Sequence, residues 1–133
     1  VSDFSPPLYI KGENRGEPTP SLFYEAMEIY QNGDYGKAYD LIRATGKGNS
    51  QICFFRGVLA LLNSDSRDAL DCFNIIINKM DPSYYDEALY FRGITYLRMN
   101  RKKDAVKEFK TLESMFSPLS KKASEKLKKL SEL

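Results

Sequence analysis

Residues 92–109 read RGITYLRMNRKKDAVKEF, and residues 56–73 read RGVLALLNSDSRDALDCF. A third stretch, residues 25–42, reads EAMEIYQNGDYGKAYDLI and follows the same pattern. Each stretch places apolar residues three and four positions apart on both sides of a short polar turn. This spacing is typical of two amphipathic helices joined by a tight connection. The sequence therefore predicts three consecutive antiparallel helix pairs.

Three positions agree when the stretches are aligned on their turns. The first helix carries a small residue, the second carries an alanine twelve positions later, and a large apolar residue follows four positions beyond. In chain order these sets are Ala26, Gly57 and Gly93; Ala38, Ala69 and Ala105; and Ile42, Phe73 and Phe109. Two helices approach closely only where side chains are small, so the large residue is expected to fill the space beside that contact. One pair cannot bury its apolar face alone, so the pairs should stack.

This set resembles the tetratricopeptide repeat (TPR), a helix pair of about 34 residues. Residues 32–38 and 88–97 are close matches to its pattern, whereas residues 64–66 read Ser-Asp-Ser where Gly-Asp-Tyr is usual. The resemblance implies an all-α, right-handed superhelix of three helix pairs with a C-terminal capping helix. The expected repeats span about residues 20–48, 50–82 and 83–117, with the capping helix at 118–133, so residues 20–133 form one repeat domain.

Several short motifs predict where helices begin. Asp34 and Asp65 follow turn residues and are expected to cap the helices after them. Three other motifs place a cap residue directly before a proline, namely Thr19-Pro20, Asp81-Pro82 and Ser117-Pro118. Proline is favoured at the first helical position, so these motifs predict three further helix starts.

Residues 1–19 are expected to form an irregular leader. Residues 1–20 contain four of the six prolines, which excludes regular helix. The apolar residues Phe4, Leu8, Tyr9 and Ile10 are unusual in such a stretch, because they would need shelter from water. We hypothesise that they lie in cis in a groove formed by the repeats.

A narrower resemblance involves the leader as well. Phe4, Tyr9 and residues 15–17, followed by Tyr-Gln-Asn-Gly-Asp-Tyr at 30–35, resemble the extracytoplasmic part of membrane-anchored repeat proteins of Bacteroidetes. In those proteins a proline-containing, aromatic leader precedes the repeats, and a membrane helix lies before it. The resemblance implies an extracytoplasmic location and association with a membrane through a preceding anchor.

In TPR proteins the first helix of each pair lines a concave groove. The resemblance therefore implies a partner-binding groove that is apolar and aromatic. Its expected residues are Tyr24, Met27, Tyr30, Phe54, Phe55, Val58, Leu62, Tyr90, Phe91, Ile94 and Arg98. Each of these positions is equally compatible with a core residue between neighbouring helices. The groove lacks the Lys, Asn and Arg pattern with which some TPR domains hold carboxylate-ended chaperone tails, so that activity is not expected.

The composition argues against catalysis. The 133-residue chain contains no histidine, so no imidazole can act as a general base or a metal ligand. Cys53 and Cys72 match no metal or redox spacing and are interpreted as small apolar fillers, with a disulfide as the alternative. Carboxylates at 65–71 and 81–87 are typical of helix caps and first turns. We expect no enzyme, no cofactor and no metal site.

The charged residues point to a solvated surface. The net charge is only +2, and the predicted last helix mixes its lysines with Glu125. Those lysines are Lys121, Lys122, Lys126, Lys128 and Lys129. This mixture favours an outer solvated face over nucleic-acid or lipid binding. Arg56 and Arg92 precede the repeat glycines and are expected to pair with acids of neighbouring helices.

Two functions fit these observations. The first is a non-catalytic protein–protein interaction module, a scaffold that binds a peptide or protein partner in the groove. The second is a structural or regulatory tail of a larger membrane-anchored protein, with the groove filled by its own leader. No apolar run reaches the roughly 20 residues that span a bilayer, so we expect no direct membrane insertion by this chain. A monomer or weak dimer is expected.

Overall fold

The computed structural model describes residues 3–11 and 20–132. The regular structure in these ranges is entirely helical, which confirms the all-α class predicted from the sequence. The helices are α1 (Ser21–Gln31), α2 (Tyr35–Arg43), α3 (Ser50–Leu62), α4 (Ser66–Lys79), α5 (Tyr85–Arg98), α6 (Lys102–Glu113) and α7 (Ser120–Ser131). Their order and spacing match three helix pairs followed by a final helix.

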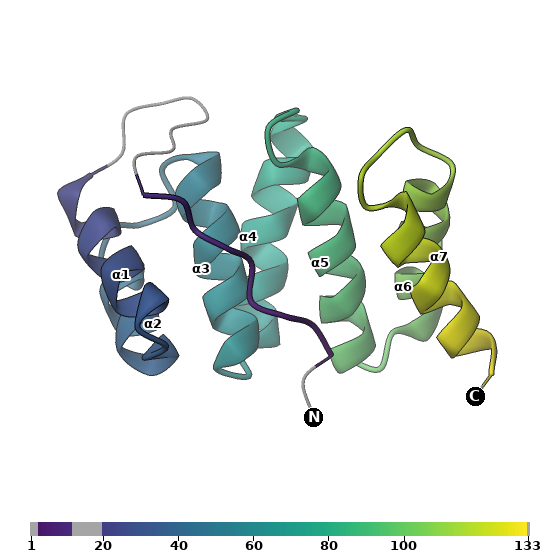
Figure 1. The fold of residues 1–133 in the computed structure, drawn as a ribbon, viewed down its shortest axis with the longest axis horizontal. Coiled ribbons are helices and arrows are strands. Elements are labelled where there is room, and N and C mark those ends of the chain that lie inside the picture. Colours follow the sequence, from purple (N-terminus) through teal and green to yellow (C-terminus); the bar gives the residue numbers. More distant parts are fainter. Residues whose placement is uncertain (1–2, 12–19, 133) are drawn as a thin grey trace.

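The helices pack mainly against their neighbours in the chain. α1 packs on α2, α3 on α4, and α5 on α6, and the contacts of α2 with α3 and of α4 with α5 join the pairs. In Figure 1, α3, α5 and α7 lie in the front row, with α4 and α6 behind them. α7 packs on α6 and follows the third pair. The first helices of the pairs, α1, α3 and α5, thus present one common face.

The predicted close contact is present in the second and third pairs. A Cβ atom added to Gly57 on α3 would lie 2.7 Å from the ring of Phe73 on α4, and Gly93 and Phe109 show the same 2.7 Å spacing. In the first pair, the equivalent residues Ala26 and Ile42 are both fully buried. The small and large residues of the second and third pairs therefore pack as expected, and those of the first pair both lie in the core.

The turn inside each pair uses a left-handed residue at the same repeat position. These residues are Gly33, Ser64 and Asn100, with φ of 86°, 61° and 58°. Glycine adopts this conformation without strain, and asparagine tolerates it better than most residues. The next residue is the N-cap of the second helix, and the side chains of two of these N-cap residues, Asp34 and Asp65, accept hydrogen bonds from Lys37 N and Asp68 N. Both predicted caps are confirmed.

The proline motifs predict helix starts less well. Pro20 occupies the N-cap position of α1 instead of the first helical position, while Thr19 lies outside the described residues. The carboxylate of Asp81 accepts from Ser83 N, and α5 begins only at Tyr85. Ser117 Oγ likewise accepts from Leu119 N, and α7 begins at Ser120. The last two predictions were wrong because these oxygens close local turns ahead of the helices.

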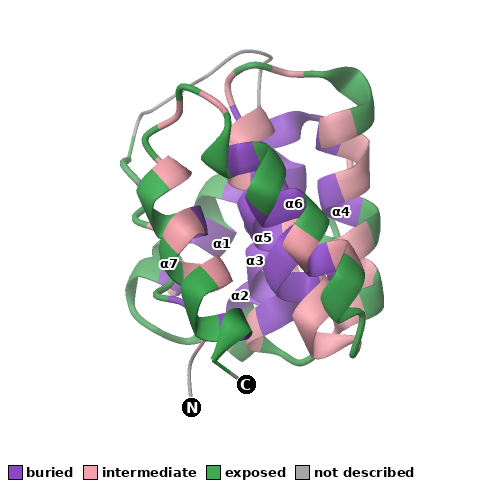
Figure 2. Cartoon of the chain, turned by 90° about the vertical axis from the view of Figure 1, so that its right-hand side faces the viewer, coloured by how far each residue is buried: buried purple, intermediate pink, exposed green. Residues whose placement is uncertain are grey.

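The core is centred on α3 and α5. Figure 2 shows the buried residues gathered in the middle of the molecule, with exposed residues on the outer sides of α7 and α4. α3 is buried on nearly all sides, because its apolar arc is wider than one neighbouring helix can cover. Phe54, Phe73 and Phe91 form a continuous aromatic group there, with ring centroids 5.7–6.5 Å apart. Within the described ranges, no helix is long and apolar enough to cross a membrane.

Candidate functional site

Residues 3–11, called the leader segment below, cross the face of α1, α3 and α5 in a single pass (Figure 1). Near its start, Phe4 is 8% exposed, and its ring packs edge-on against Phe91 of α5 at 5.4 Å between centroids. Near its end, Tyr9 is 4% exposed and packs on Phe23 of α1 at 5.8 Å and on Phe55 of α3 at 5.5 Å. Two aromatic side chains therefore anchor the leader segment to three helices.

Only half of the leader residues named in the cis hypothesis are sheltered. Phe4 and Tyr9 are buried as expected, but Leu8 is 82% exposed and Ile10 is 56% exposed. The prediction was wrong for Leu8 and Ile10. In an extended chain, neighbouring side chains point in opposite directions, so the inward position of Tyr9 turns both of its neighbours outward.

An ion pair fixes the start of the leader segment. The guanidinium of Arg98 donates to both carboxylate oxygens of Asp3, at 2.9 Å from Nε and 2.6 Å from Nη2. Arg98 also donates to the main-chain oxygen of Leu61, which fixes the orientation of its side chain. Partial burial would raise the pKa of Asp3, but hydrogen bonds and the charge of Arg98 outweigh burial and lower it. The carboxylate is thus held in its charged form.

Three side chains bind main-chain oxygens of the leader segment. Tyr30 Oη donates to Pro7 O, and Gln31 Nε2 donates to Tyr9 O at 3.1 Å. From the opposite end of the molecule, Lys126 Nζ on α7 donates to Asp3 O at 2.7 Å. These contacts recognise the backbone of the segment and do not depend on its side chains. Main-chain hydrogen bonds of this kind contribute to the binding of extended peptides in known recognition modes.

The residues expected to line the groove are mostly covered in the structure. Tyr30, Phe55, Phe91 and Arg98 contact the leader segment directly. The others divide by burial: Met27, Phe54, Val58, Tyr90 and Ile94 are buried, Leu62 is partly buried, and Tyr24 is 40% exposed. The face expected to form the groove is therefore occupied by the leader segment, and several of its residues belong to the core.

Two polar side chains that bind the leader segment were not predicted from the sequence. Gln31 lies at the last position of α1, and no feature of the sequence singles it out. Lys126 was assigned to a solvated face, which is wrong for this residue because it is partly buried and bound to the leader segment. Burial lowers the pKa of Lys126, and the charge of Asp3 only partly opposes this shift. The other four lysines of that group do not share this contact.

A cleft of about 360 Å³ opens beside Phe4, between the leader segment, the start of α5 and α7. Its apolar part includes Phe54, Phe91 and Leu119. Its rim combines Lys122 and Lys129 with carboxylates of α5 and α7. The cleft continues the leader-bound face toward the C-terminal helix, and it mixes aromatic and charged surface.

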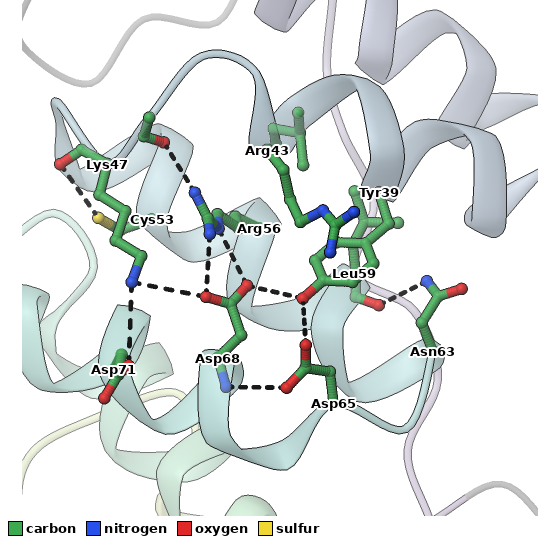
Figure 3. Close-up of polar contacts among 12 residues, drawn as sticks. Tyr39, Arg43, Lys47, Cys53, Arg56, Leu59, Asn63, Asp65, Asp68 and Asp71 are labelled. Atoms are coloured by element: carbon green, nitrogen blue, oxygen red, sulfur yellow. Dashed lines mark hydrogen bonds and ion pairs between the residues drawn. The ribbon is translucent and has the colours of Figure 1, made fainter.

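A separate polar cluster joins α2, α3 and α4 (Figure 3). Arg56 donates to both oxygens of Asp68 at 2.9 and 3.0 Å. Tyr39 Oη lies 2.7 Å from the Asp68 carboxylate and 2.9 Å from that of Asp65. Burial opposes ionisation of Asp68, but the bonds from Arg56 and Tyr39 lower its pKa, whereas burial and the two carboxylates raise the pKa of Tyr39. The cluster therefore links the first helix pair to the second.

The third pair contains a related ion pair. Arg92 donates to both carboxylate oxygens of Glu108 on α6 at 2.9 and 3.0 Å, and its third nitrogen donates to Asn74 of α4 at 3.0 Å. The prediction that Arg56 and Arg92 pair with acids of neighbouring helices is confirmed. Arg92 links the second and third pairs as Arg56 and Tyr39 link the first and second.

The two cysteines are buried and form no disulfide. Burial raises the pKa of Cys72 and of Cys53, and two lysines and Arg56 only partly oppose the shift at Cys53. Both thiols therefore stay protonated in the folded chain. This agrees with their interpretation as small apolar fillers.

No protein-family model matches the sequence, and a search of curated proteins finds no significant match.

Proposed function

We propose that this chain is a TPR-like helical-repeat module, without catalytic activity, that binds an extended polypeptide segment on the face of α1, α3 and α5. One observation carries the proposal. The leader segment lies on this face and is held through its main-chain oxygens by Tyr30, Gln31 and Lys126. A face that binds backbone in this way can accept other extended segments of suitable sequence.

The right-handed TPR-like superhelix is part of this proposal. It is supported by features that recur between pairs, namely the Gly57–Phe73 and Gly93–Phe109 contacts and the left-handed turn residues. A stack of repeats with equivalent first helices offers a continuous surface along its length, which suits an extended ligand.

The proposal names a protein or peptide as the partner and excludes nucleic acid. Lys126 contacts the leader segment, while the other lysines of α7 are mixed with carboxylates. The absence of catalysis is supported by the ionic clusters, in which Arg56 engages Asp68 and Arg92 engages Glu108. By its resemblance to membrane-anchored repeat proteins, we place the module on the extracytoplasmic side, as a monomer or weak dimer.

A second candidate function is a structural or regulatory tail whose face is permanently filled by its own leader. The burial of Phe4 and Tyr9 favours this candidate, because both are as inaccessible as residues of the core. The two candidates differ in one property. A binding module exchanges its leader segment for a free peptide and keeps its fold. A structural tail loses its helical fold when its leader segment is released.

Exchange of the leader segment separates the two candidates. A protease site is introduced between Lys11 and Pro20, the purified full chain is cut once, and a fluorescent peptide of residues 1–11 is added. For a binding module, the anisotropy of the peptide rises and saturates while the helical signal in circular dichroism is kept. The uncut chain is the control and should bind far less peptide, because its tethered segment has an effective concentration of about millimolar. Loss of the helical signal on release, with no exchange, would support the structural tail.

A further inference from the structure

We infer that the partner segment carries an acidic residue followed directly by an aromatic residue, with a second aromatic residue five positions later. This inference rests on the proposed function and names the sequence class of its ligand. It follows from which side chains of the leader segment are held and which are not. The held side chains are those of Asp3, Phe4 and Tyr9.

Arg98 recognises the first two positions together. Its guanidinium binds the Asp3 carboxylate through two hydrogen bonds and also lies 5.5 Å from the centre of the Phe4 ring. One planar cation therefore contacts both an acid and the adjacent aromatic ring, and lysine could not reproduce this geometry. The bond from Arg98 to Leu61 O holds the guanidinium toward the leader segment. An acid–aromatic pair is thus the sequence that this site fits.

The second aromatic position is set by the seam between α1 and α3. The ring of Tyr9 meets Phe23 and Phe55 edge-on, with interplanar angles of 75° and 85°. Tyr30 also packs edge-on against Phe55, with ring centroids 5.7 Å apart, and its hydroxyl donates a hydrogen bond to Pro7 O. The same helices therefore hold the second ring and the backbone just before it. Because Phe4 packs on Phe91 and Tyr9 packs at this seam, the leader segment meets the two contact points with residues five positions apart.

The side chains at the remaining positions of the leader segment contribute little to recognition. Ser5, Pro6, Leu8 and Ile10 are exposed, and the bond to position 7 is made through its main-chain oxygen. The pattern Asp or Glu, aromatic, four residues, aromatic occurs once in the whole sequence, at residues 3–9. The leader segment is therefore the one internal competitor of this class. A partner must carry the same pattern and bind well enough to displace a tethered copy.

The experiment uses the full chain with a weakened leader segment, Asp3→Asn/Phe4→Ala/Tyr9→Ala. Fluorescent peptides of residues 1–11 are titrated into this variant and into the unmodified chain, and anisotropy is measured. We expect the variant to bind the unmodified peptide about tenfold or more tightly than the unmodified chain does, because the internal competitor is weakened. Peptides carrying Asp3→Asn, Phe4→Ala or Tyr9→Ala should each lose about tenfold or more in affinity. Peptides carrying Ser5→Ala or Leu8→Ala, which change exposed positions, should stay within about twofold.

The outcomes separate the inference from the proposed function. If the peptide binds but all five variants bind equally well, the sequence class is wrong and the binding function stands. If no peptide binds, both are overturned. Light scattering could instead show a dimer in which two chains exchange their leader segments. If such a dimer forms and free peptide never binds, the inference is also overturned. Should the triple variant lose its cooperative thermal unfolding, the same peptides are titrated into the chain cut between Lys11 and Pro20.

Discussion

Phe73 fills the space that a side chain on Gly57 would occupy. The nearest ring atoms lie 2.7 Å from an ideal Cβ position on Gly57, a distance that real Cβ atoms essentially never show. Both partners lie in the core, so neither the ring nor the helix can move aside into solvent. The contact sets how closely α3 and α4 approach. Gly93 and Phe109 set the approach of α5 and α6 in the same way.

Adding one methyl group at Gly57 should therefore destabilise the fold. We expect Gly57→Ala to lower the free energy of unfolding by about 1–3 kcal/mol, because the added carbon overpacks a filled site. Urea denaturation followed by circular dichroism measures the change. Gly48→Ala is the matched control, since nothing lies within 4 Å of a Cβ there, and it should be neutral or slightly stabilising. Adding Phe73→Leu to Gly57→Ala should recover part of the loss, and a neutral Gly57→Ala would contradict this account.

Within the leader segment, truncating either buried aromatic side chain should lower the free energy of unfolding, whereas truncating either exposed apolar side chain should not. We expect Phe4→Ala and Tyr9→Ala each to lower the free energy of unfolding by about 1.5–3 kcal/mol, the usual value of burying a large apolar side chain. Leu8→Ala and Ile10→Ala are matched controls on the same segment and should stay within about 0.5 kcal/mol. Equal effects at all four positions would mean that the segment does not rest on the helices in this register.

The helix pairs were predictable because their signal is local and repeated. Ala26, Gly57 and Gly93 occur at the same place in each pair, and their large partners follow sixteen residues later. Periodic spacing within one pair is visible in a sequence, and its packing consequence follows from side-chain size. The face of α1, α3 and α5 followed in turn from the resemblance of these pairs to TPRs.

The occupant of that face was only partly predictable. The apolar character of the leader pointed to burial of Phe4 and Tyr9, but composition alone did not indicate which neighbours turn outward. Contacts such as Gln31 to Tyr9 and Lys126 to Asp3 join residues 22 and 123 positions apart. Such contacts produce no periodic pattern in the sequence, because they depend on how segments far apart in the chain pack together. The late start of α5 has a local cause, since Asp81 uses its carboxylate in a turn.

The two thiols should be inert in the folded chain. Burial removes Cys53 and Cys72 from solvent and raises the pKa of both, so the reactive thiolate is rare near neutral pH. We expect a chromogenic disulfide reagent to label neither cysteine in native buffer and both in concentrated urea. Ser21→Cys, at an exposed position in the first turn of α1, is the positive control and should react at once under native conditions. Rapid labelling of the unmodified native chain would show that α3 and α4 open readily.

Docking of the leader segment should weaken in acid. The hydrogen bonds and charge of Arg98 lower the pKa of Asp3 in the folded chain, despite its partial burial. A carboxyl with a lowered folded pKa stabilises the folded state above its unfolded pKa of about 3.9, and this contribution is lost as the pH falls through the lowered value. We therefore expect the unmodified chain to be more stable than Asp3→Asn near pH 6, with the difference shrinking below about pH 4. Urea midpoints measured from pH 6 to pH 2.5 test this.

Asp40→Asn removes a carboxylate that is 77% exposed and should change the free energy of unfolding at pH 6 by less than about 0.5 kcal/mol. A difference between the unmodified chain and Asp3→Asn that stays constant down to the lowest pH would mean that the Asp3–Arg98 pair does not hold the leader segment through its charge.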